Sequence, residues 1–180
     1  MAPVTKSKPS RAGEERAEPS VALVLDHAAE TDGARARLAD IVGWLFAHGV
    51  RHVTIVGAGD IDPASLPRTD PGTSLRLLAT QTGRASVVAA VASCLRSGTA
   101  ITHQSLDAEA EHFSGPSPDL ILLIGEHARL DDAFTWTAAY SELCLLPAPW
   151  EKLTEAEVAR AVEDFARRDR RFGALGPASP

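Results

Sequence analysis

Four short runs of apolar residues have the length and composition of buried β-strands. The first run, residues 21–25 (VALVL), ends at the charged residue Asp26. A continuous apolar run of this length is typical of a strand that is covered on both faces of a sheet. We expect three further strands, of which the last is the most apolar and is predicted to be central: residues 53–56, 74–79 and 120–124.

The segment between the first two strands has helical spacing. Apolar residues recur there every three or four positions, which predicts a helix with one buried side: Leu38, Ile41, Val42, Leu45 and Phe46. Thr31 or Asp32 can cap the start of this helix. Gly49 is suited to the left-handed conformation that ends many helices.

Two further helices are expected in the middle of the chain. Residues 84–96 place a set of apolar side chains on one side, and Gly98 follows as a stop: Val87, Val88, Val91 and Leu95. Residues 105–113 predict a short helix. Residues 57–72 hold three prolines and several aspartates, and therefore indicate a loop.

The final helix has the clearest start signal in the chain. Thr154 and Glu157 have the spacing of a capping box, in which each side chain accepts a hydrogen bond from the backbone of the other. Leu153 and Val158 can form the hydrophobic contact that often accompanies such a box. Further apolar positions extend the core face of this helix: Ala161, Val162 and Phe165.

The order strand, helix, strand at the start of the chain predicts parallel strands. We therefore expect an α/β fold, a single domain with a central, mostly parallel sheet flanked by helices, over residues 21–175. Residues 1–20 have almost nothing to bury, and we expect a disordered N-terminal tail there. Residues 176–180 are expected to form a C-terminal tail.

Composition and charge exclude some classes of function. With 18 Lys and Arg against 24 Asp and Glu, the formal net charge is −6, which argues against a nucleic-acid partner. Cys94 and Cys144 form neither a CxxC pair nor a metal-binding cluster, as expected in a reducing compartment. No apolar run approaches the roughly 20 residues that span a bilayer, and the N-terminus lacks a signal-peptide core. We therefore expect a cytoplasmic location.

Few residues carry a signal for chemistry by themselves. Gly57-Ala58-Gly59 lacks the third glycine and the following helix of a dinucleotide site, so a plain turn is the better interpretation. Asp26 can hold Mg²⁺ against a diphosphate, since ligands bind beyond the carboxyl ends of parallel strands. A capping or turn-forming role for Asp26 is the alternative. Arginines cluster at the end of the final helix, where cations also stabilise the helix dipole: Arg167, Arg168, Arg170 and Arg171.

The C-terminal half resembles a known family. PDLILLIGEHARLDDAFTWTAAYSELCLLPAPW, from residue 118, and EAEVARAVEDFARRDRRFGAL, from residue 155, are similar to undecaprenyl diphosphate synthases and other cis-prenyltransferases. Residues 21–56 resemble the first strand, helix and second strand of that family, and Thr82-Gly83-Arg84 resembles its GGR motif. The resemblance covers residues 21–175 and implies a cis-prenyltransferase-like domain that handles isoprenoid diphosphates.

The departures from the family pattern fall on its two diphosphate sites. Catalytic members follow the first-strand aspartate with Gly-Asn and an Arg-Trp element, whereas Asp26 is followed by His27-Ala28-Ala29 and then the helix. A histidine side chain obstructs the close approach of backbone amides to a phosphate. At the second site, the first family arginine falls on Leu123 and a serine falls on Asp131, which removes positive charge. Two positions still match the second arginine and the metal-assisting glutamate of the family: Arg129 and Glu142.

The shortened opening and the end of the chain resemble the Nogo-B receptor group. In that group an inactive cis-prenyltransferase-like subunit pairs with a catalytic subunit, and its C-terminal Arg-x-Gly reaches the active site of the partner. Arg171-Phe172-Gly173 matches this motif. The resemblance implies an accessory subunit of a heterodimeric or heterotetrameric cis-prenyltransferase, in which Arg171 and Gly173 bind the substrate diphosphate. It also implies that the partner holds most of the Mg²⁺ site, with residual metal positions in this chain: Asp26 and Glu142.

Two alternatives remain open at this point. An autonomous, homodimeric short-chain cis-prenyltransferase would use Asp26, Arg129 and Glu142 itself. A scaffold or binding module would keep the fold without an active site. If the chain is an accessory subunit, we expect the contact with the partner to run through the central strand and the neighbouring helices. A peripheral contact with a membrane through the complex is left open.

Overall fold

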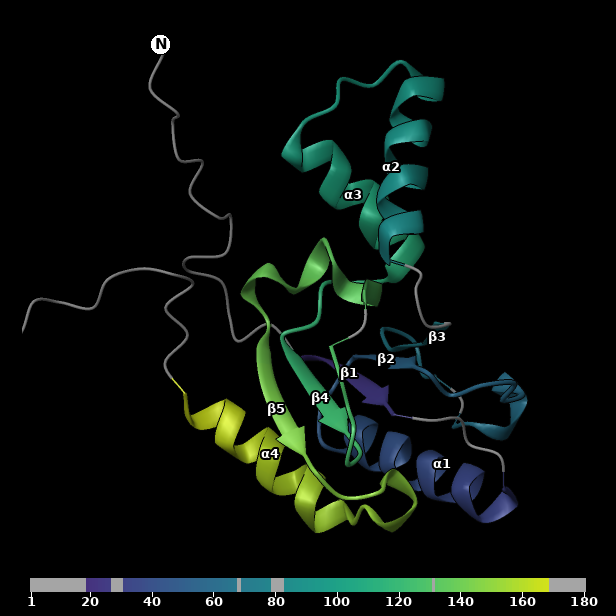
Figure 1. Cartoon of the computed structure of the whole chain (residues 1–180), viewed down its shortest axis with the longest axis vertical. Helices are drawn as coiled ribbons and strands as arrows, with labels where there is room; N and C mark the ends of the chain where they lie inside the picture. Colours follow the sequence, from purple (N-terminus) through teal and green to yellow (C-terminus); the bar gives the residue numbers. More distant parts are fainter. Residues whose placement is uncertain (1–18, 27–30, 68, 79–82, 131, 169–180) are drawn as a thin grey trace, which may run out of the picture.

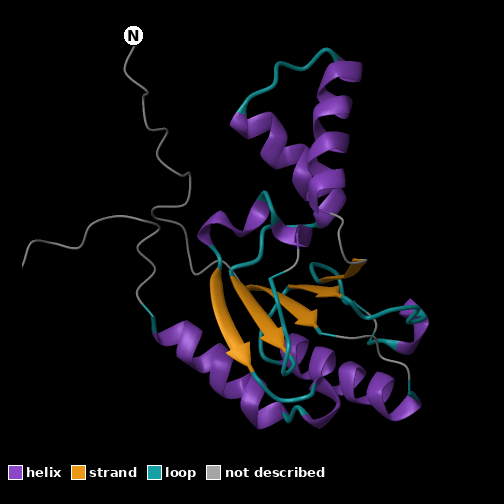
Figure 2. Cartoon of the chain, viewed as in Figure 1, coloured by secondary structure: helices purple, strands orange, loops and turns teal. Residues whose placement is uncertain are grey.

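Five parallel strands form the sheet of the described chain, in the order β3-β2-β1-β4-β5 (Figures 1 and 2). The computed structural model describes residues 19–26, 31–67, 69–78, 83–130 and 132–168. The strands are β1 (Ser20–Leu25), β2 (His52–Val56), β3 (Ser74–Leu78), β4 (Leu120–Ile124) and β5 (Glu142–Leu146). All neighbouring pairs in this order are parallel. The prediction of an α/β fold with a parallel sheet is confirmed.

The four predicted strands are present, but β4 is not the central one. β1 lies in the middle of the sheet, between β2 and β4. The prediction was wrong because a fifth strand, β5, pairs with the other side of β4. The sequence pattern did not reveal β5, since its five residues alternate between half-buried and exposed positions and the exposed positions carry leucines.

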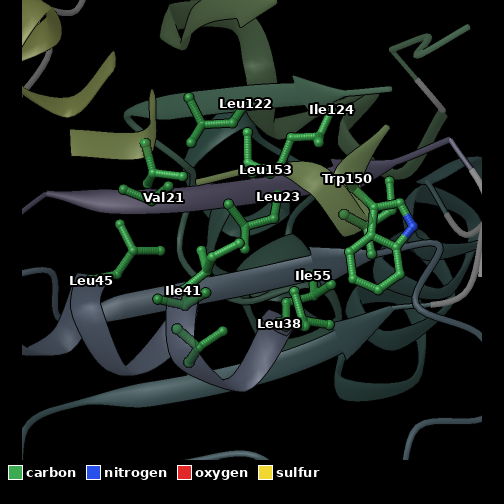
Figure 3. Close-up of a cluster of buried hydrophobic side chains, with 14 of the residues drawn as sticks. Val21, Leu23, Leu38, Ile41, Leu45, Ile55, Leu122, Ile124, Trp150 and Leu153 are labelled. Carbon is green, nitrogen blue, oxygen red and sulfur yellow. The ribbon is translucent and has the colours of Figure 1, made fainter. Parts of the chain in front are cut away.

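One face of the sheet is covered by two helices, α1 (Asp32–Ala47) and α4 (Glu155–Arg167), as Figure 1 shows. The main hydrophobic core fills the space between these helices and the strands. Figure 3 shows part of it, including Leu23, Ile41 and Trp150, each of which is at most 1% exposed. Full burial of such a side chain stabilises the fold by about 1.5–3 kcal/mol relative to exposure, so this face contributes most of the stability.

The predicted ends of α1 are confirmed. The hydroxyl oxygen of Thr31 accepts a hydrogen bond from the backbone N–H of Ala34 at 3.1 Å, which satisfies one of the unpaired donors at the helix start. His48 is the last capping residue, and Gly49 follows with φ at +87°. A residue with a Cβ adopts this left-handed conformation only at a cost, which explains the glycine.

The capping box predicted at the start of α4 is also present. The N–H of Thr154 donates to Glu157 Oε2 at 2.9 Å, and the N–H of Glu157 donates to Thr154 Oγ1 at 3.3 Å. Leu153 and Val158 are fully buried beside the box. The backbone and hydroxyl donors of Thr154 favour the charged carboxylate, which lowers the pKa of Glu157 from its ordinary value.

Replacing Thr154 by alanine is expected to lower the free energy of unfolding by about 1 kcal/mol, because α4 loses its N-cap. The contribution of Glu157 is present above the unfolded-state pKa of 4.5 and is lost as the pH falls through the lowered folded-state value. Urea titrations at neutral pH and below both pKa values should therefore show a smaller loss at the acidic pH. Thr31→Ser, which keeps a cap on α1, is the control. An equal loss at both pH values would contradict the role given to the Glu157 carboxylate.

The second face of the sheet has a much thinner cover. The chain crosses this face between β4 and β5, and Ala133 and Phe134 of a single short 3-10 turn, Asp132–Phe134, pack onto it. They form a small second cluster with side chains of three strands: Ala22, Val24, Val56, Ile121 and Leu123. Helices do not supply the main cover of this face in the described part of the chain.

Helices α2 (Gly83–Ser97) and α3 (His103–Ser114) pack on each other and project away from the sheet (Figure 1). The prediction of α2 and of its stop at Gly98, with φ at +69°, is confirmed. Its apolar side is not buried, however: Val88 is 69% and Leu95 is 67% exposed. Helical spacing identifies an apolar side but cannot show whether the same chain covers it. None of the described helices is long and apolar enough to cross a bilayer.

Candidate functional site

Asp26 lies at the carboxyl end of β1, where its side chain rests against the backbone of Gly125. The N–H of Asp26 donates to the carbonyl oxygen of Ile124 at 3.1 Å, which holds the residue beside the end of β4. Gly125 has φ at +126°, and a Cβ at this position would overlap the Asp26 carboxylate. Glycine is therefore required at position 125 both by the backbone conformation and by the aspartate. The half-buried carboxylate is fixed at the edge where parallel sheets bind ligands.

Arg129, the second predicted site residue, lies in the segment that leaves β4. It is exposed, as are Glu126 and His127 earlier in the same segment. Two acidic residues, Asp26 and Glu126, also follow the carboxyl ends of the neighbouring strands β1 and β4. One exposed arginine among carboxylates is a weak binding site for a diphosphate, which requires several cationic or N–H donors.

Leu123, which the sequence resemblance aligned with a family arginine, is buried in an apolar environment. It is 5% exposed and packs in the second cluster with Val24 and Phe134. An arginine here would bring a charge into a space lined by aliphatic and aromatic groups, without a described anionic partner in that cluster. Leu123 therefore packs as part of the fold and offers no hydrogen-bond donor to a diphosphate.

Glu142, the third predicted site residue, lies at the amino ends of the strands, whereas Asp26 lies at their carboxyl ends. In the parallel register it pairs with Leu120 at the start of β4, whereas Asp26 follows the end of β1. A separation of about five strand residues corresponds to roughly 15 Å. The two carboxylates therefore cannot bind one metal ion within a single chain, and this pair does not fit Mg²⁺. Among the described residues, no group of three or more His, Cys, Asp and Glu side chains could hold a metal ion.

Glu142 is paired with Arg168, one of the arginines that the sequence analysis expected to stabilise the dipole of the final helix. Its Oε2 accepts a hydrogen bond from Arg168 Nη1 at 2.9 Å, just beyond the last residue of α4. Arg168 also lies close to Cys144: burial raises the pKa of the Cys144 thiol, and the positive charge of Arg168 partly opposes this shift. Cys94 and Cys144 are both free, as predicted.

An open pocket of about 530 Å³ lies between the start of α2 and the 3-10 turns on the second face. Its lining is mixed, with one arginine and one aspartate among small and apolar residues: Arg84, Leu130, Asp132, Phe134, Thr135, Ala138 and Ala139. Asp132 accepts a hydrogen bond from the N–H of Gly83 at 3.3 Å and lies 3.8 Å from Arg84. A carboxylate at a helix N-terminus stabilises the helix dipole. It also occupies the place where an anionic ligand would bind, so the pocket offers a diphosphate little positive charge.

Two acidic residues that the sequence analysis did not single out have structural roles. Asp119 of the PDL segment is buried, and its Oδ2 accepts a hydrogen bond from the N–H of Ser20 at 2.9 Å. Asp132 connects the start of α2 to a turn 49 residues later. Neither contact has a local sequence signal, because each joins segments far apart in the chain.

Several residues named in the sequence analysis lie outside the described residues. These are His27-Ala28-Ala29, Thr82, Asp131, and the tail residues Arg171 and Gly173. Of the described candidates, the structure places Asp26 and Arg129 on segments that leave the carboxyl ends of neighbouring strands. It separates Glu142 from them.

Comparison with known proteins points to one family. A family model described as putative undecaprenyl diphosphate synthase matches residues 64–173. An isoprenyl transferase of Agrobacterium fabrum is 37% identical over 91 residues, which make up 51% of this chain and 37% of that protein. An isoprenyl transferase of Brucella abortus is 32% identical over 120 residues, 63% of this chain and 47% of that protein. The chain thus spans less than half of the length of these curated relatives.

Solved structures have the same fold. A probable undecaprenyl diphosphate synthase from Campylobacter jejuni has a TM-score of 0.69 at 13% identity, covering 88% of this chain and 100% of that chain. Lavandulyl diphosphate synthase from Lavandula x intermedia, in complex with dimethylallyl diphosphate, has a TM-score of 0.64 at 16% identity, covering 87% and 99%. At these identities the similarity establishes the fold alone. Because the family model matches more than half of the 180 residues, the chain belongs to the family described as putative undecaprenyl diphosphate synthase, the cis-prenyltransferases.

Proposed function

We propose that this chain is an accessory, non-catalytic subunit of a heteromeric cis-prenyltransferase that makes polyprenyl diphosphate from allylic and isopentenyl diphosphates. The observation that carries the proposal is the packing of Leu123. The place of a diphosphate-binding arginine is filled by a leucine that is 5% exposed and surrounded by apolar side chains. Asp26 and Glu142 lie too far apart to share one metal ion within a single chain, so a metal site that used both would need a second chain.

The surface that supports a partner subunit is the open edge of the sheet at β5. Leu143 is 43% and Leu145 is 67% exposed on the second face, and among the described residues β5 has a neighbouring strand on only one side. Exposed apolar side chains on an unpaired edge strand are typical of a surface that another chain covers. Val88 and Leu95 add an exposed apolar stripe on α2. We define the β5 surface by Leu143 and Leu145.

The contact expected through the central strand needs correction. β4, which the sequence analysis took as central, is hydrogen-bonded on both sides and is at most 5% exposed, so a partner cannot pair with it. The true central strand, β1, is equally enclosed. The partner we propose is therefore a catalytic chain of the same family that docks on the β5 surface.

In this complex the chain contributes its C-terminal Arg-x-Gly to the partner. The guanidinium of Arg171 would donate hydrogen bonds to a substrate diphosphate, and Gly173 would let a backbone N–H approach it closely. Mg²⁺ would be held mainly by the catalytic subunit. In the sequence, Arg171 follows the last residue of α4 by four positions.

The proposal predicts that Arg171→Ala lowers the activity of the complex by at least about tenfold, the loss expected for one charge-assisted contact to a phosphate. The chain would be co-purified with a catalytic synthase that retains the full family motifs, and chain elongation would be assayed with allylic and isopentenyl diphosphates and Mg²⁺. Arg160→Ala, an exposed arginine on α4, is the matched control. Unchanged activity of an intact Arg171→Ala complex would overturn the proposal.

An autonomous enzyme is the second candidate, because curated relatives in the family are isoprenyl transferases. In that case Asp26, Arg129 and Glu142 would act within a homodimer. Turnover by the purified chain alone, with Mg²⁺ and both C5 diphosphates, would establish this function. Activity that disappears in Asp26→Asn but not in Arg160→Ala would assign it to this chain and exclude a contaminating synthase.

A further inference from the structure

We propose that the α2–α3 arm, the helix pair Gly83–Ser97 and His103–Ser114, is a surface that binds a second copy of this chain. The contact runs through the side of α2 that faces away from α3, and the two α2 helices lie antiparallel about a twofold axis. This inference goes beyond the proposed function and does not rest on it, because the catalytic subunit is proposed to dock on the β5 surface. The two surfaces have no residue in common.

The arm has a small core of its own, separate from the core of the sheet. Where α2 and α3 pack on each other, the buried side chains are small and at most 3% exposed: Ala90, Cys94 and Ala110. None of them belongs to either hydrophobic cluster of the sheet. A polar contact fastens the base of the arm, since Trp136 Nε1 donates to Asp107 Oδ1 at 2.8 Å. The rest of the arm stands clear of the sheet and is open to another chain (Figure 1).

The side of α2 that faces away from α3 carries a continuous apolar stripe. Val88 is 69% and Leu95 is 67% exposed, and Ala92 is exposed between them. At about 100° of rotation per residue, these three positions lie on the side of the helix opposite Ala90 and Cys94. α3 therefore cannot cover the stripe within the same chain, and the other described residues leave it uncovered.

The spacing of the stripe is self-complementary. A twofold contact uses the same patch on both subunits, so that residue i meets residue j and residue j meets residue i. In an antiparallel pair of α2 helices centred between Val91 and Ala92, Val88 faces Leu95 of the second copy, and Leu95 faces its Val88. The small Ala92 beside the axis lets the helices approach to the roughly 8–10 Å of close helix packing. Each stripe therefore covers the other.

The charges on α2 favour the antiparallel direction. The helix has no acidic residue, and Arg84 in its first turn has a side chain that is 85% exposed. The nearest carboxylate oxygen, on Asp132, is 3.8 Å away, which is too long for a hydrogen bond. A parallel pair would bring the two Arg84 side chains together. An antiparallel pair instead places each Arg84 beside the carboxyl end of the other α2, where the helix dipole attracts a cation.

The tip of each arm extends the contact to the base of the other. The stripe alone is smaller than the roughly 800 Å² per partner of a standard interface. Ile101, which follows α2 and is 48% exposed, comes level with the base of the second arm in the antiparallel pair. The 530 Å³ pocket beside Arg84 opens there, and Leu130 in its lining is 46% exposed. An interface of this limited size predicts self-association with a dissociation constant of about 1–100 μM.

The experiment measures the mass of the purified full chain by sedimentation between about 1 and 500 μM. We expect a shift from monomer to dimer across this range. Val88→Asp and Leu95→Asp should each weaken the dimer at least about 100-fold, because the twofold axis introduces the charge twice into an apolar contact. Ala36→Asp on α1 is the matched control and should dimerise like the wild type. Circular dichroism checks that each variant keeps its helices.

Cross-linking tests the register even if an aspartate variant fails to fold. In a Cys144→Ser background, a mixture of Val88→Cys and Leu95→Cys chains should form disulfide-linked dimers on mild oxidation. Either chain alone should form several-fold fewer, because positions 88 and 95 face each other across the axis and not themselves. Equal yields from the mixture and from the single variants would contradict the antiparallel pairing.

The outcomes separate this inference from the proposed function. A chain that stays monomeric at every concentration overturns the inference. A dimer that Leu145→Asp abolishes and Val88→Asp retains would place the second copy on β5 and also overturn it. If the chain alone is monomeric and Val88→Asp weakens binding of the catalytic subunit, the stripe belongs to that partner. Since Val88→Asp keeps the β5 surface intact, it should bind the catalytic subunit as the wild type does, so either proposal can fail without the other.

Discussion

Replacing Leu123 by arginine, the residue that the sequence resemblance implies for the family at this position, is expected to unfold the chain instead of creating a diphosphate site. Leu123 is buried between β1 and β5 in the sheet and packs against Phe134 on the second face. An unpaired guanidinium there would lose its hydration, and the larger side chain would displace the thin cover of the sheet. We expect a loss of at least about 3–5 kcal/mol, a large part of the 5–15 kcal/mol that stabilises a typical domain.

Leu145→Arg is the matched control for this prediction. Leu145 is the register partner of Leu123 on β5 and lies on the same face, but it is 67% exposed. In the isolated chain an arginine at position 145 stays in water, so the free energy of unfolding should change by less than about 1 kcal/mol. Urea titration of both variants, monitored by circular dichroism, measures the difference. A folded Leu123→Arg variant with the stability of the wild type would show that the second face can accommodate a charge at this position.

The elements that could be predicted from sequence are those whose determinants are local. Thr31 and Gly49 mark the two ends of α1, and Thr154 and Glu157 cap the start of α4. In each case the determining contacts span only a few residues. The buried strands could be predicted for a similar reason, since enclosure on both faces requires a continuous apolar run. β5 could not, because its stability as a strand comes from the hydrogen bonds to β4, which lies about 20 residues earlier.

The candidate site was harder to predict because it depends on register and distance. The resemblance implied two residual metal positions, Asp26 and Glu142, and the parallel pairing puts them at opposite ends of the strands. The contact between Glu142 and Arg168 joins residues 26 positions apart, and neither has a local signal. The Leu123 substitution was visible in the sequence. The burial of Leu123 against Phe134 was not visible in the sequence, and this burial leaves no room for an arginine at position 123.

Replacing Leu145 by aspartate is expected to abolish association with the catalytic subunit while leaving the isolated chain folded. Leu145 is the more exposed of the two leucines that define the β5 surface. Burial of a leucine side chain contributes about 1.5–3 kcal/mol, and an aspartate at an apolar contact adds the cost of removing a charge from water. Together these effects should weaken binding by at least about 100-fold.

Ala36→Asp provides the control for this prediction, since Ala36 is exposed on α1, which covers the first face of the sheet. Subunit affinity would be measured by titration calorimetry, and the mass of each mixture by light scattering. If a homodimer forms through β5 instead, Leu145→Asp should convert it to a monomer and Ala36→Asp should not. If Leu145→Asp still formed the complex with full affinity, the interface would lie on a surface other than β5. The exposed stripe on α2, around Val88 and Leu95, would then be the surface to test, because large apolar side chains of the described chain are exposed there as well.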